Sequence, residues 1–135
     1  MDLKVMKGGV MGGIAGGMVF GMLMQMMGIM PMIAKMLGSD STLVGWMVHI
    51  VISIVTGVMF GMVFASKVTS YKSGFGFGVM YGLVWWVLGS LIAMPLGLGM
   101  GVQFSNAFDQ MHLMSMMGHM IFGGVLGAVY AKFTV

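Results

Sequence analysis

The sequence has very few groups that could face water and none that could form a disulfide. Among its 135 residues there is no cysteine, and only six side chains are basic and three acidic. Without cysteine there is neither a disulfide nor a thiolate metal ligand. A soluble domain needs a charged surface, which 7% of charged residues cannot supply. Paired carboxylates, a hydroxyl beside a base and a nucleotide-binding motif are also missing, so we do not expect the chain to be an enzyme on its own.

What fills the chain instead is apolar. Hydrophobic residues make up 59% of it, and the mean hydropathy is +1.05. Four apolar runs are each long enough to cross a bilayer, at residues 5–27, 43–65, 74–94 and 111–133. The sequence therefore predicts an all-α, four-helix transmembrane bundle that forms a single integral membrane domain over residues 1–135. Its surroundings would be the lipid bilayer of a cell or cytoplasmic membrane.

The lysines predict how the bundle is oriented. Five of them fall on one side of a four-span topology and only Lys35 falls on the other; the five are Lys4, Lys7, Lys67, Lys72 and Lys132. An excess of basic residues marks the cytoplasmic side, so both termini are expected in the cytoplasm. The net charge is only +3, and the basic residues are too few and too scattered to bind a polyanion, so we expect no nucleic-acid partner.

Two stretches of the sequence repeat each other. Trp46 to Gly61 aligns with Met116 to Ala131 when His49 is laid on His119, 70 residues later. In each copy the histidine is followed at four-residue steps by small residues, which are Ser53, Gly57 and Gly61, then Gly123, Gly127 and Ala131. This spacing keeps side chains on one helix face, where small residues let another helix approach closely. Both histidines are therefore expected to point into the protein.

Glycine columns extend the repeat to the other two spans. Gly8, Gly12 and Gly16 in the first span match Gly74, Gly78 and Gly82 in the third, 66 residues later. The chain then consists of two tandem parallel two-helix halves, about 1–66 and 70–135, related by an axis along the membrane normal. The glycine face of the first span is expected to pack against a neighbouring span or against a partner subunit.

Proline and capping signals predict where the spans end. Pro95 is expected to end the third span. Asp40, Ser41 and Thr42 are candidates for capping the second span. Asn106 with Asp109 resembles a capping pair that opens the fourth span.

The histidines are the strongest candidates for chemistry, because ionisable groups at such depth are rare. In one interpretation they are structural, each bonding a carbonyl, a serine or the other histidine. In a second, His119, Met116 and His112 bind copper together with Asp109 or His49, since copper accepts imidazole and thioether ligands. In a third, His49 and His119 are axial ligands of haem b. Proton relay and small-molecule binding also stay open, and the 22 methionines are spread over every span.

Short motifs add a resemblance. They are Gly45-Trp46 with His49, Pro95 two residues before Gly97, and the stretch from Gly118-His119 to Gly123. Together they resemble an uncharacterised family of short four-span bacterial and archaeal membrane proteins, known as a domain of unknown function. The resemblance implies the four-helix fold and the pairing of the two histidines, and it brings no established activity. The methionine content departs from the leucine-rich pattern of that family.

These features favour a non-catalytic accessory or assembly subunit of a larger membrane complex, respiratory or copper-dependent, with other membrane subunits as partners. The alternative is a copper- or haem-binding membrane protein that uses the paired histidines. A small channel or transporter is a further alternative, although no acidic residue lies within a span.

Overall fold

The chain is helical throughout and has no strand in the computed structural model, which describes all 135 residues. The four long apolar helices are α1 (Leu3–Met26), α3 (Thr42–Phe64), a third span from Tyr71 to Gly97, and α6 (Gln110–Thr134). The third span runs through α4 (Tyr71–Trp85), a π-helical segment η1 (Trp86–Ala93) and α5 (Met94–Gly97). The short elements are α2 (Met30–Lys35) and the 3₁₀ turn η2 (Phe104–Asn106). All four spans are long and apolar enough to cross a membrane, as predicted.

Polar caps determine where the four spans begin. The side chains of Asp2, Ser41, Ser70 and Asp109 each accept a hydrogen bond from a backbone N–H in the first turn of the following helix. Ser41 was among the predicted caps. Asn106, however, does not cap the fourth span, because it belongs to η2 and Asp109 is the residue that caps α6. Caps satisfy the free N–H groups of a helix start, so the helices begin slightly before the apolar runs do.

The third span continues past Pro95, where the sequence predicted its end. Proline has no N–H, so the carbonyl four residues earlier loses its usual helical partner. That carbonyl belongs to Leu91, and the backbone N–H of Gln103 donates to it over 2.8 Å. The loop that follows the span thus supplies the missing hydrogen bond, and the helix can run on to Gly97.

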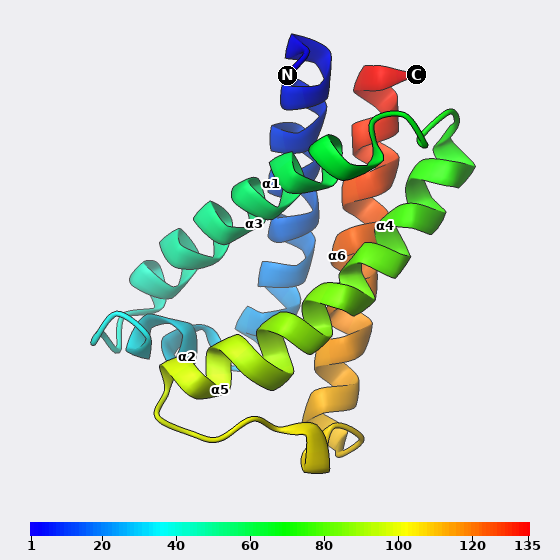
Figure 1. Cartoon of the computed structure of the whole chain (residues 1–135). Helices are drawn as coiled ribbons and strands as arrows, with labels where there is room; N and C mark the ends of the chain where they lie inside the picture. Colours follow the sequence, from blue (N-terminus) through cyan, green and yellow to red (C-terminus); the bar gives the residue numbers. More distant parts are fainter.

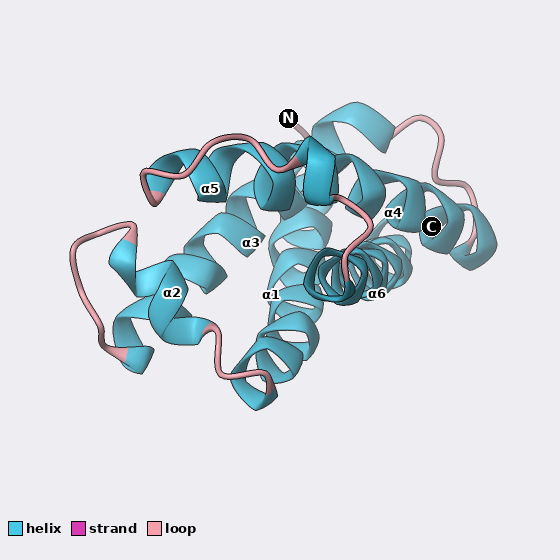
Figure 2. Cartoon of the chain, turned by 90° about the horizontal axis from the view of Figure 1, so that it is seen from below, coloured by secondary structure: helices cyan, strands magenta, loops and turns pink.

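The long helices are arranged around α1 and α6, which lie side by side (Figure 1). The other long helices pack on this pair, α3 on α1 and α4 on α6, whereas the backbones of α3 and α4 rarely come close and the two helices meet through side chains. Both chain termini lie at one end of the bundle, which we call the terminal end. The opposite end carries α2, α5 and η2 and is the loop end, seen from below in Figure 2. The α3–α4 side is therefore the loosely packed side of the bundle.

Glycines bring the helices of each pair into backbone contact. A Cβ atom on Gly13 of α1 would overlap the carbonyl oxygen of Ser53 in α3. A Cβ atom on Gly78 of α4 would likewise overlap the carbonyl oxygen of Gly123 in α6. Both pairs therefore pack as closely as two helices can, which only glycine permits.

The two glycine columns of α1 face different helices. Gly9, Gly13 and Gly17 face α3, in the way that Gly74, Gly78 and Gly82 of α4 face α6. The predicted column of Gly8, Gly12 and Gly16 faces α6 instead, at Tyr130, Leu126 and Phe122. The glycines of matching role are thus 65 residues apart and not 66. Adjacent columns lie on adjacent helix faces, and the sequence alone does not tell which column meets which helix.

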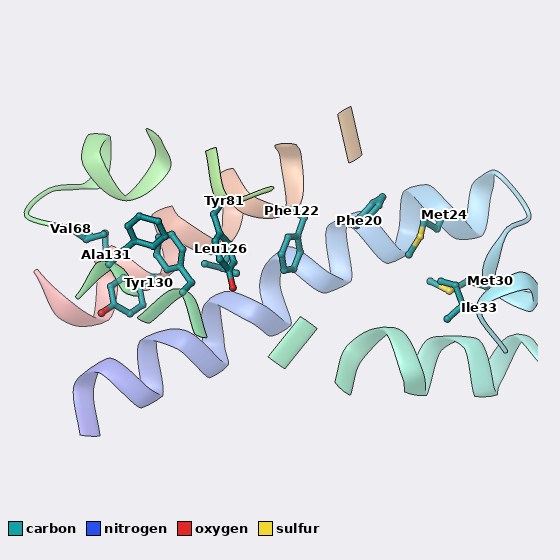
Figure 3. Packing of buried hydrophobic residues seen from close by; sticks show 12 residues of the cluster. Phe20, Met24, Met30, Ile33, Val68, Tyr81, Phe122, Leu126, Tyr130 and Ala131 are labelled. Carbon is teal, nitrogen blue, oxygen red and sulfur yellow. The ribbon is translucent and has the colours of Figure 1, made fainter. Parts of the chain in front are cut away.

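The apolar core extends along α1, from Tyr130 and Ala131 of α6 at one side to Met30 and Ile33 of α2 at the other (Figure 3). Phe60 of α3 is fully buried, and its ring centroid lies 5.3 Å from those of both Tyr81 in α4 and Tyr130 in α6. The hydroxyl of Tyr81 donates to the carbonyl oxygen of Thr56 over 2.7 Å. This is the only side-chain hydrogen bond between α3 and α4, and it joins the aromatic contacts of Phe60 and Phe64 with α4 in holding the two helices together.

Candidate functional site

A cavity of about 370 Å³ lies among α1, α3, η1 and α6 and extends toward the loop end. All three histidines of the chain line it, and no lysine, aspartate or glutamate does. Most of the remaining lining is apolar, including six methionines: Met24, Met27, Met36, Met94, Met100 and Met111. The cavity therefore collects the titratable imidazoles in an otherwise uncharged space.

His49 uses one ring nitrogen to join α3 to α1. Its Nε2 lies 2.8 Å from the carbonyl oxygen of Gly17, and since a carbonyl only accepts, Nε2 carries the hydrogen. The backbone carbonyl of His49 in turn accepts the hydroxyl of Ser53 over 2.7 Å. His49 is 8% exposed, so this bond is buried between the two helices. Its Nε2 is thereby committed to packing.

His119 is held differently, by its own helix. Its Nδ1 donates to the carbonyl oxygen of Ser115 over 2.8 Å. In the neutral ring the hydrogen is then on Nδ1, and Nε2 is a bare acceptor. No protein group bonds Nε2, and a Cβ atom on Gly89 of η1 would lie 3.8 Å from it. His119 thus presents an unused lone pair to the cavity, beside the π-helical segment.

A hydrogen bond between two serines links the His119 helix to that segment. The hydroxyl of Ser115 donates to the hydroxyl oxygen of Ser90 in η1 over 2.9 Å. Ser115 also lies 3.4 Å from Nδ1 of His119, which is the closest approach of a hydroxyl to a base here. Because that Nδ1 already donates to a carbonyl, it cannot take the serine proton. The pair positions the ring and does not form an activated nucleophile.

The two histidines differ because the helices around them pack differently. At His119 itself, α4 and α6 touch so closely that a Cβ atom on Gly82 would overlap the His119 carbonyl oxygen. The ring is therefore directed past α4, toward η1. The residue one turn earlier differs as well, since it is Ser115 before His119 but Gly45 before His49. Gly45 lies against the backbone of Met30 in α2.

Phe20 of α1 contacts both imidazoles edge to face. Its ring centroid lies 5.7 Å from that of His49 and 4.7 Å from that of His119. Axial ligation of haem b would need one nitrogen from each histidine on opposite faces of a porphyrin. Phe20 packs against both rings, and Nε2 of His49 is bonded to Gly17. The arrangement does not offer haem two axial ligands.

The residues considered for copper do not converge on one point, although the three histidines line the same cavity. Asp109 and His112 form the first turn of α6, where the Asp109 carboxylate accepts the backbone N–H of His112 over 2.9 Å and its Nδ1–H over 2.8 Å. The first of these bonds holds the pKa of Asp109 below its usual value. Met116 packs in another cluster, beside Trp86 and Leu91. No three residues among histidine, cysteine, aspartate and glutamate come together as a metal-ligand set.

Several lining residues were not singled out from the sequence. Ser90 and Ser115 join η1 to α6, and Gly89 stands against His119. Trp85 also lines the cavity, and its buried indole N–H has no hydrogen-bond partner. The signal available was a serine four residues before His119, the spacing that lets both residues share one helix face. No comparable pattern in the sequence indicated the π-helical segment.

Comparison with protein-family models, curated proteins and solved structures gives no match. The resemblance of the Gly45-Trp46 and Gly118-His119 motifs to a four-span family therefore stays a prediction.

Proposed function

We propose that the protein is a non-catalytic accessory or assembly subunit of a larger membrane complex. The observation that carries this proposal is the apolar surface of the loop end. Large hydrophobic side chains are exposed at that end: Leu37, Leu96, Met100, Val102, Phe104 and Phe108. Phe108, the most exposed of them, is 79% exposed. Large apolar side chains exposed at the end of a helix bundle favour interaction with other proteins or with the membrane, and a partner subunit would cover them.

The hydrogen bonds around the histidines support a non-catalytic role. His49 and the Asp109–His112 pair bond within the chain, and Ser115 is not activated. A reaction would need a nucleophile or an acid–base pair aimed at a common point. Each imidazole has one nitrogen bonded within the chain and the other left as an acceptor, which suits binding.

The second candidate function is copper(I) binding. What favours it is the free Nε2 of His119 in a cavity that six methionines line, because copper(I) accepts both imidazole and thioether ligands. In this proposal the copper ligands would be His119 and lining methionines. Met116, which packs elsewhere, would not take part.

Native mass spectrometry of the protein extracted gently from its own membranes tests both candidates. We expect co-migrating subunits that stay bound to the chain. A chain that runs alone with no added mass contradicts the subunit proposal. A chain that carries the mass of copper, and loses it in the His49→Ala, His119→Ala double variant, supports the second candidate instead.

We also propose that the chain is a tandem repeat of two parallel halves, about 1–66 and 70–135, with both termini in the cytoplasm. The matching glycine contacts of α1 with α3 and of α4 with α6 support the repeat. The link between α3 and α4, flanked by Lys67 and Lys72, lies at the same end as both termini (Figure 1). This grouping of lysines supports the orientation.

Cysteine labelling tests the orientation, and the absence of native cysteine makes every label specific. Ser66→Cys lies at the terminal end and Ser105→Cys at the loop end, and both positions are exposed. In intact cells a membrane-impermeant maleimide is expected to label Ser105→Cys at once. It should label Ser66→Cys only after the membrane is permeabilised. The reverse pattern would place the termini outside.

A further inference from the structure

The Nε2 atom of His119 is an acceptor held in place for a partner that the chain does not supply. The ring cannot exchange its nitrogens without losing the bond from Nδ1 to the Ser115 carbonyl. The bond from Ser115 to Ser90 of η1 fixes this turn of α6 in position. A polar atom that lacks a partner in an apolar interior is unfavourable. A ligand that donates a hydrogen bond would satisfy it.

The lining of the cavity determines the charge of such a ligand. No charged side chain faces the space, so nothing would compensate an ion that the imidazoles and methionines do not coordinate. Burying an unpaired charge at membrane depth costs much free energy, whereas burying an uncharged donor costs only the loss of its hydration. The ligand is therefore neutral, with a hydroxyl or N–H at one point and an apolar remainder.

The shape of the lining favours a flat ring. Three aromatic side chains line the cavity, Phe20, Trp85 and Phe122, and Phe20 packs directly on His119. Aromatic rings pair with one another edge to face or with offset stacking, and gain more than their buried area alone would give. A volume of about 370 Å³ is at the small end of ligand pockets, enough for one substituted ring.

The access route points to a lipid-soluble molecule. The cavity lies on the loosely packed side, where the backbones of α3 and α4 rarely come close and the π-helical segment follows. Ile52 of α3 lines the cavity and is 46% exposed, so the cavity is not sealed at this side chain. A molecule dissolved in the hydrocarbon would reach the cavity without crossing water.

We propose that this cavity binds a neutral phenol or hydroquinone from the bilayer, whose hydroxyl donates to Nε2 of His119 while its ring packs among Phe20, Trp85 and Phe122. This goes beyond the subunit role and does not depend on it. The binding involves no bond making or electron transfer within the chain.

Fluorescence titration of the purified chain in detergent tests the proposal, because Trp85 lines the cavity and would be quenched by a bound ring. The probes are tert-butylhydroquinone and its dimethyl ether, which has the same ring but no donor. The protein is first washed with a copper(I) chelator, so that no metal occupies the nitrogen. We expect saturable quenching by the hydroquinone, and at least tenfold weaker binding of the ether. Equal affinity for the two would overturn the proposal.

Two variants locate the binding. In Gly89→Val the new methyl groups would cover Nε2 without removing it, since the Cβ position is 3.8 Å away and clashes with nothing. His119→Phe keeps a ring but removes the acceptor. Both are expected to weaken hydroquinone binding at least tenfold.

Gly76→Val is the matched control, because Gly76 lies in the same span with nothing within 4 Å of its Cβ position. It should bind like the parent protein. An unchanged affinity in Gly89→Val and His119→Phe, or an equal loss in Gly76→Val, would show that the hydroquinone does not bind at His119.

Discussion

Gly78→Val is expected to lower the free energy of unfolding by about 3 kcal/mol or more, because the added carbons meet backbone that cannot move aside. A Cβ atom at Gly78 would overlap the carbonyl oxygen of Gly123 and would lie 3.2 Å from the Cα of Gly127. No flexible side chain is available to give way, so α4 and α6 would have to separate along their length. Reversible unfolding in mild detergent, followed by tryptophan fluorescence, measures the loss.

Gly76→Val again provides the control, now for stability. It makes the same change in helix propensity two residues away, on an exposed face where a Cβ has open space. Its free energy of unfolding should stay within about 0.5 kcal/mol of the parent, as is usual for surface substitutions. If both valines cost the same, the close α4–α6 contact does not hold the fold together.

Two tyrosine-to-phenylalanine changes are expected to have opposite signs. Tyr81→Phe removes the hydroxyl that donates to Thr56, and should lower the free energy of unfolding by about 1 kcal/mol. Tyr130→Phe removes a buried hydroxyl that has no partner, and should raise it by about 1 kcal/mol, because the hydroxyl no longer has to be desolvated. Both variants keep the ring, so their packing is unchanged, and the same unfolding measurement compares them.

The sign is the informative part of this pair. Equal destabilisation by both changes would mean that the Tyr130 hydroxyl has a partner after all. A neutral Tyr81→Phe would mean that α3 and α4 are held without the only side-chain hydrogen bond between them.

The spans were predictable because hydropathy and helix length follow directly from the sequence. The predicted run at 43–65 corresponds to α3 at Thr42–Phe64, and the run at 111–133 to α6 at Gln110–Thr134. The third span was the exception. Its continuation past Pro95 depends on Gln103, a residue in a later loop that bonds the freed carbonyl of Leu91. Sequence rules for proline consider only the helix itself, so they could not include this bond.

The site was less predictable than the fold. The small-residue stripes indicated that His49 and His119 point inward, and both line the cavity. What each imidazole bonds was not encoded in the repeat, because it depends on how closely the neighbouring helix approaches. At Gly82 the helices touch at the level of His119, so its ring turns toward η1, whereas His49 reaches across to Gly17. Equivalent positions in a repeat can therefore have different chemistry.

The π-helical segment from Trp86 to Ala93 makes the exact length of the third span matter. There the backbone bonds reach five residues back, as from Met94 to Gly89, so the segment holds an extra residue compared with α-helix. Deleting one residue within it would restore α-helical bonding, and the helix beyond would keep its direction because the π-helical turn already accommodates the extra residue. The wall that Gly89 and Ser90 form opposite His119 would nevertheless change, since one residue would be lost from it. A single-residue deletion would therefore remodel the cavity while the loop end stays attached to the span.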